Sequence, residues 1–76
     1  MPRIAPVHWR ELERVVLRLG LKFARQKGSH RAYTREGLIR PVIIPERAQI
    51  PVSIIKNILD TLGVSRDEYF RLLTEK

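Results

Sequence analysis

The sequence predicts an α+β fold, a two-layer sandwich in which helices cover one face of a three-stranded antiparallel sheet. Two observations carry this prediction. Apolar residues recur with helical spacing near both ends of the chain, and with a period of two between them. Size supports it, because 76 residues with 43% hydrophobic and 30% charged residues suit one small folded domain over residues 1–76 rather than a disordered chain.

An apolar stripe with helical spacing predicts a first helix over about residues 7–19. The stripe consists of Leu12, Val15, Val16 and Leu19. Pro6 suits the first turn of a helix, and Gly20 suits the position just past its end.

The pattern then changes to alternation, which predicts three strands. The segments are residues 21–26, 29–34 and 38–44. Gly28 and Gly37 are typical turn residues between them. Pro41 lies inside the third segment and has no N–H to donate to a sheet, so this strand is expected at a sheet edge or with a bulge.

A second apolar stripe predicts a helix that begins near Pro51 and ends at Gly63. It consists of Ile55, Ile58, Leu59 and Leu62. Ser65 is followed three residues later by Glu68, a capping box that predicts a short extra C-terminal helix over residues 66–73. Short connections favour a meander with both main helices on one face. This α-β-β-β-α order is also that of double-stranded-RNA-binding domains.

Composition excludes several function classes. The chain has no cysteine, which removes disulfides, thiolate nucleophiles and cysteine-based zinc or iron–sulfur sites. Its two histidines and eight carboxylates show no metal-site spacing, so neither a metal nor another cofactor is expected. No apolar run approaches the roughly 18 residues of a membrane span, and the N-terminal segment lacks the apolar region of a secretory signal. A cytoplasmic protein is expected.

The charge indicates an anionic partner, either nucleic acid or an acidic protein. Fifteen Lys and Arg residues stand against eight Asp and Glu residues, a net charge of +7. The excess is concentrated in residues 22–40, where six basic side chains accompany the single acidic residue Glu36.

The segment R-Q-K-G-S-H-R at residues 25–31 has the residue types that bind and cleave an RNA backbone. Lysine and arginine neutralise phosphate, and glycine allows close approach of the backbone. The imidazole of His30, with a reference pKa of about 6.5, suits proton transfer at a ribose 2′-hydroxyl. The candidate catalytic residue is therefore His30, and the candidate RNA contacts are Arg25, Lys27, Gly28, Ser29 and Arg31.

Strand geometry narrows this set. In a regular strand His30 and Arg31 point to opposite faces, so Arg25 and Lys27 are the better candidates to share a site with His30. Nothing in the sequence places His8, at the start of the first helix, near His30. Tyr33 is expected to pack in the sheet rather than stack on a base, and Trp9, Phe23 and Phe70 are expected in the core.

Two motifs fall on the second and third predicted strands. They are K-G-S-H-x-x-Y at residues 27–33 and V-x-I-P at residues 42–45. On these motifs the sequence resembles the HicA-type mRNA interferase toxins of toxin–antitoxin systems. The resemblance extends over nearly the whole chain, including Gly20-Leu21, Gly37, the helix from Pro51 and Leu62-Gly63-Val64-Ser65.

The resemblance implies a double-stranded-RNA-binding-like fold, metal-independent cleavage of mRNA and neutralisation by a cognate HicB-like antitoxin protein. It places the family's catalytic histidine on His30 and its functionally important glycine on Gly28. Two departures stand out. Many members have a second histidine where this chain has Arg31, and several have a histidine shortly after the third strand, where residues 45–48 read Pro-Glu-Arg-Ala.

Two other functions stay open on the sequence alone. A basic domain of this order could bind structured RNA without cutting it, through phosphate and 2′-hydroxyl contacts. It could also act as a protein-interaction unit whose basic face and edge strand dock an acidic partner.

Overall fold

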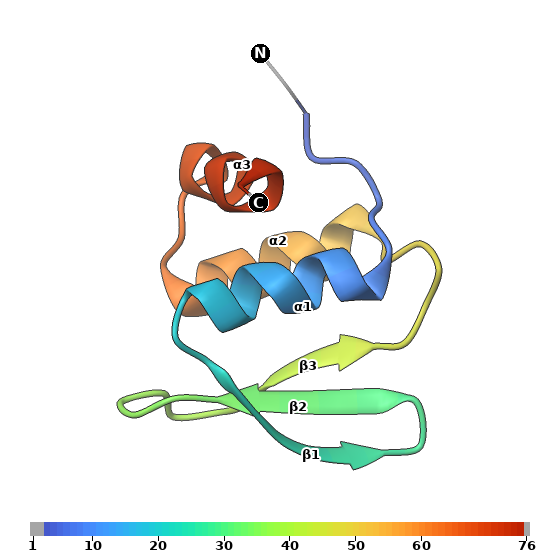
Figure 1. Cartoon of the computed structure of the whole chain (residues 1–76), viewed down its shortest axis with the longest axis vertical. Helices are drawn as coiled ribbons and strands as arrows, with labels where there is room; N and C mark the ends of the chain where they lie inside the picture. Colours follow the sequence, from blue (N-terminus) through green and yellow to red (C-terminus); the bar gives the residue numbers. More distant parts are fainter. Residues whose placement is uncertain (1–2, 76) are drawn as a thin grey trace.

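Six elements follow one another in the order α-β-β-β-α-α in the computed structural model, which describes residues 3–75 (Figure 1). They are α1 (Trp9–Arg18), β1 (Lys22–Lys27), β2 (His30–Thr34), β3 (Val42–Pro45), α2 (Val52–Leu62) and α3 (Arg66–Thr74). The strands form one antiparallel sheet in the order β1-β2-β3. The predicted α+β fold is confirmed.

All three helices lie on the same side of the sheet (Figure 1). The first two, α1 and α2, lie next to the sheet, and α3 lies over them on the side away from it. Within the part of the chain that the structure describes, no helix covers the opposite face of the sheet. That uncovered face is therefore where strand side chains meet solvent or a ligand.

The helix ends follow the local signals of the sequence. Ser65 Oγ accepts a hydrogen bond of 3.1 Å from the backbone N–H of Glu68, as the capping box predicts. The N-cap of α1 is His8, whose Nδ1 accepts from the backbone N–H of Arg10 at 3.1 Å. His8 thus has a structural role, since a capping side chain satisfies one of the free N–H groups at a helix start.

The third strand is shorter than predicted. It begins at Val42 rather than at Leu38, and it extends to Pro45. Pro41 has no N–H, so pairing with β2 starts one residue after it, where Val42 lies opposite Tyr33. The strand is at the sheet edge, as Pro41 indicates. The register shift in the sheet lies instead in β1, between Phe23 and Arg25.

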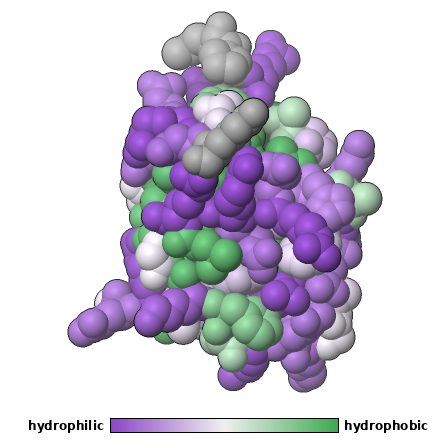
Figure 2. All heavy atoms as spheres, in the orientation of Figure 1, coloured by the Kyte–Doolittle hydropathy of each residue, from purple (hydrophilic) through white to green (hydrophobic). Residues whose placement is uncertain are grey.

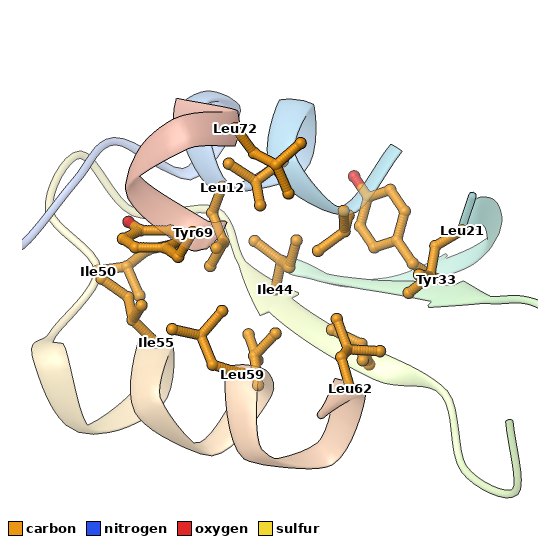
Figure 3. Close-up of a cluster of buried hydrophobic side chains, with 14 residues drawn as sticks. Leu12, Leu21, Tyr33, Ile44, Ile50, Ile55, Leu59, Leu62, Tyr69 and Leu72 are labelled. Carbon is orange, nitrogen blue, oxygen red and sulfur yellow. The ribbon is translucent and has the colours of Figure 1, made fainter. Parts of the chain in front are cut away.

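The core lies between the helices and the sheet, where side chains from α1, α2, α3, β2 and β3 point toward one another (Figure 3). Leu12, Val15 and Val16 of the first predicted stripe and all four members of the second are buried. Phe23, expected in the core, is 47% exposed. It belongs to β1, whose side chains are all exposed because the two main helices pack over the other edge of the sheet.

Hydrophilic side chains cover most of the side of the molecule seen in Figure 2, and apolar surface there is confined to small patches. None of the helices in residues 3–75 is both long and apolar enough to cross a bilayer.

Candidate functional site

The turn between β1 and β2 sets the geometry of the candidate site. It consists of two residues, Gly28 and Ser29, and it places Lys27 directly opposite His30 in the antiparallel ladder. Gly28 has φ = 59°, whereas no non-glycine residue that the structure describes has a positive φ. A positive φ at the first position only is typical of a type II′ hairpin turn, for which glycine is preferred there. The glycine is therefore needed for the turn that presents His30.

The uncovered face of the sheet has a hollow of 350 Å³ beside this turn, and we call it the basic hollow. Its lining consists of Arg25, Lys27, His30, Ala32 and Ile43. None of its three polar side chains has a hydrogen bond or an ion pair within residues 3–75, and no carboxylate lines it. The structure thus brings together the three residues that strand alternation selected.

Arg31 lies on the other face of β2. Its Nη2 is 3.3 Å from Glu13 Oε2 of α1, and its Nη1 is 3.4 Å from Glu46 Oε2. Its guanidinium also lies 5.0 Å from the ring centroid of Trp9 and 4.5 Å from that of Phe23. The guanidinium of Arg31 is therefore engaged by carboxylates and aromatic rings of the protein itself. Arg31, a candidate RNA contact on the sequence, is therefore not brought to the basic hollow.

A chain of hydrogen bonds connects the turn to Arg31 on the helix-covered side of the sheet. Gln26 Nε2 donates to the carbonyl oxygen of Gly28 at 2.9 Å and to Glu46 Oε1 at 3.0 Å. The backbone N–H of Glu46 donates to the carbonyl oxygen of Ser29 at 2.7 Å. Arg31 Nη1 donates to Gln26 Oε1 at 3.0 Å. Both carbonyls of the turn are thus held by side chain or backbone from neighbouring segments.

Tyr33 anchors the same cluster from the core. The side chain is fully buried, which agrees with its predicted packing role. Its hydroxyl donates to Glu13 Oε2 and accepts from Arg31 Nε at 2.9 Å. Burial, together with the hydrogen bond to Glu13, raises the pKa of Tyr33 to about 12. The hydrogen bond to Tyr33 in turn contributes most to raising the pKa of Arg31.

Sequence reasoning missed Gln26 and Glu46 as supports of the site. The sequence did contain a signal for Gln26. Strand alternation places it on the face opposite to Arg25 and Lys27, which is the face of Arg31. Glu46 carried no local signal, because its contact with Gln26 spans 20 residues. Only the pairing of β2 with β3 brings it beneath the turn.

No group of three or more histidine, cysteine or carboxylate side chains that could hold a metal ion occurs in residues 3–75. The second histidine, His8, stacks on Trp9 and caps α1, and it does not line the basic hollow.

The sequence profile of the family described as HicA toxin of bacterial toxin-antitoxin matches residues 9–64. The chain belongs to the HicA toxin family. The HicA match begins at the first residue of α1 and ends just beyond α2, so it includes the basic hollow and its supporting network, whereas α3 lies outside it. A search among curated proteins found no match.

Membership of the HicA family makes the protein a toxin of a toxin–antitoxin system. A toxin of this kind has an antitoxin as its partner. The family resemblance found in the sequence is thereby confirmed.

Proposed function

We propose that residues 1–76 form one domain that acts as a metal-independent endoribonuclease and cleaves mRNA in the cytoplasm. One observation carries this proposal: His30, Arg25 and Lys27 line one hollow on the uncovered face of the sheet and have no partner within residues 3–75. An imidazole in the same hollow as two unpaired cations suits a reaction in which a proton moves while negative charge grows on a phosphoryl group.

In the proposed reaction, RNA lies across the uncovered face with one phosphate in the basic hollow. His30 takes the proton of the adjacent ribose 2′-hydroxyl, and the 2′ oxygen attacks phosphorus. The bond from phosphorus to the 5′ oxygen breaks, that oxygen takes up a proton from water, and protonated His30 later returns its proton to solvent. The products are a 2′,3′-cyclic phosphate and a 5′-hydroxyl end. Lys27 and Arg25 offset the negative charge on the phosphoryl oxygens.

Gly28 and Ser29 serve this site through the turn. Their backbone supports the approach of a phosphate beside His30, and the turn holds His30 opposite Lys27. The cognate partner that we propose is a HicB-like antitoxin protein with an acidic surface, because the lining of the basic hollow has cations and no carboxylate to oppose such a surface.

The test is an RNA cleavage assay on the wild type and His30→Ala, with EDTA present throughout and the fragment ends identified. We expect His30→Ala to lower the cleavage rate by about 10²–10⁴-fold, the usual contribution of a general acid or base. A matched control is His8→Asn, which removes the other imidazole but keeps a side chain that caps α1. Its cleavage rate should equal that of the wild type.

Equal activity of wild type and His30→Ala would refute the assignment of His30. If neither cleaves RNA and both bind it with strong salt dependence, the protein is a non-catalytic RNA-binding module. If neither cleaves nor binds RNA, the basic face serves a protein partner alone.

A further inference from the structure

A second hollow, which we call the apolar groove, lies between the free edge of β3 and α2. Its volume is 410 Å³. Val42 and Ile43 line it from the strand, and Ile54 and Ile58 line it from the helix. Pockets that hold small ligands begin at roughly 300 Å³, so the groove has room for a flat group of the size of a nucleobase.

The apolar groove and the basic hollow meet. His30 and Ile43 line both. A molecule with its phosphate beside His30 can therefore place a second, apolar group in the groove, provided that a short linker joins the two groups. A nucleotide has this construction.

The rim of the groove is polar and positive. Arg40 and Arg47 line it together with the amide of Asn57 and the hydroxyl of Thr61. All four side chains are exposed, and none has a hydrogen bond or an ion pair to another described residue. No carboxylate lines the groove. The groove thus offers apolar walls for the faces of a base, an amide for its edge and cations for flanking phosphates.

The same groove could in principle take an added β-strand from a partner protein, but the edge of β3 argues against this. Backbone N–H groups of alternate strand residues face the same side, so positions 41, 43 and 45 share one edge. Proline is tolerated in a strand where its missing N–H faces away from the ladder. Pro41 and Pro45 therefore leave Ile43 as the single donor on the free edge. A strand needs more donors than this to pair.

We propose that the apolar groove holds the nucleobase next to the phosphate bound at His30, and that Asn57 reads the edge of this base. The inference rests on the proposed function in so far as the ligand is RNA. It adds a base-binding subsite to a phosphate site, and it makes the groove a determinant of where the RNA strand is cut.

The test compares two oligomers that cannot be cleaved through a 2′-hydroxyl. One is a single-stranded 2′-O-methyl RNA of 12 nucleotides with mixed bases, and the other is the same chain without bases. We expect the base-bearing oligomer to bind about tenfold more tightly. In methyl NMR spectra it should shift the signals of Ile54 and Ile58, whereas the abasic chain should shift only signals of the basic hollow.

Two variants of α2 sharpen the measurement. Thr61→Trp places a large ring at the exposed rim of the groove, and it should remove the advantage of the base-bearing oligomer while abasic binding is kept. Ser53→Trp is the matched control, since Ser53 is exposed on the same helix and lines neither hollow. It should keep the tenfold advantage. Asn57→Ala should flatten the base preference around the cleavage positions of a random RNA pool.

Equal binding of the two oligomers, or equal shifts of Ile54 and Ile58 with both, would overturn the proposal. Shifts of these methyl groups by an extended acidic peptide and not by the base-bearing oligomer would overturn it in favour of a protein-docking groove. If the wild type cleaves no RNA but the base-bearing oligomer alone shifts Ile54 and Ile58, the proposed nuclease activity is refuted and the proposed base subsite is supported.

Discussion

Arg31 and Glu46 form an ion pair, with 3.4 Å between Nη1 and Oε2, on the helix-covered side of the sheet. Arg31 follows His30 in β2, and Glu46 follows directly after β3. Glu46 also accepts from Gln26, which donates to the carbonyl oxygen of Gly28. The ion pair is therefore part of the network that supports the turn presenting His30.

Glu46→Ala should weaken both stability and cleavage. The side chain is 29% exposed and accepts from Gln26 and Arg31, so we expect a loss of about 0.5–1 kcal/mol in the free energy of unfolding. Because Glu46 acts through the turn, kcat should fall while KM changes little. Chemical unfolding and steady-state kinetics measure the two effects.

The matched control for this prediction is Glu36→Ala. Glu36 is an exposed carboxylate in the loop between β2 and β3, and it has no ion pair in the described structure. Removing it should leave stability and kcat unchanged. A similar loss of kcat in both variants would show that net charge, and not the support of the turn, determines the effect.

The salt dependence of RNA binding should distinguish cations on the uncovered face of the sheet from Arg31 on the helix-covered face. Arg25→Ala and Lys27→Ala should each lower the slope of log K against log salt by about 0.7, the value for one phosphate contact on a single strand. Arg31→Gln should leave the slope unchanged, because this cation is already paired with Glu13 and Glu46.

Arg71→Ala is the control for the loss of a charge alone, since Arg71 lies on α3 and pairs with Glu68 and Glu75. Fluorescence anisotropy with a labelled single-stranded RNA at several salt concentrations gives all these slopes. If Arg31→Gln changes the slope as much as Lys27→Ala does, Arg31 also contacts an RNA phosphate, contrary to this prediction.

Gly28→Ala should destabilise the protein by about 1–2 kcal/mol, because an L side chain rarely adopts the left-handed φ of 59° found here. Open space surrounds the added Cβ, so the effect is backbone strain and not collision. Gly37→Ala introduces the same strain, at φ = 88°, in a turn away from His30. Both variants should unfold more easily, but only Gly28→Ala should lose cleavage at a temperature where both are folded.

Stability should fall in alkali through Tyr33. Its pKa is about 12 in the folded protein and about 10 in the unfolded chain. The folded state therefore holds this proton more tightly, and the resulting stability is complete below pH 10 and is lost as the pH rises to 12. We expect a decrease of up to about 2–3 kcal/mol, which Tyr33→Phe removes. Denaturant unfolding at stepped pH measures it, and a decrease unchanged in Tyr33→Phe would contradict the assignment.

The helices and the order of the strands could be predicted from local patterns, because periodicity and capping residues act within a few positions of each other. Ser65 and its partner Glu68 are an example. The start of β3 could not be placed, since apolar residues already begin at Leu38 and only the pairing of Val42 with Tyr33 defines the strand. Phe23 was misplaced because burial depends on which edge of the sheet the helices cover.

By itself, the sequence determined the fold class, the family and the gathering of Arg25, Lys27 and His30, because a strand has a fixed alternation and a two-residue turn fixes the register. The tertiary structure alone decided which cations stay free. Glu13 and Glu46 come from distant segments, and the folding of α1 over the sheet and the pairing of β3 bring them to Arg31. Charge pairs form between neighbours in space, so the partner of a cation follows from packing and not from its position in the chain.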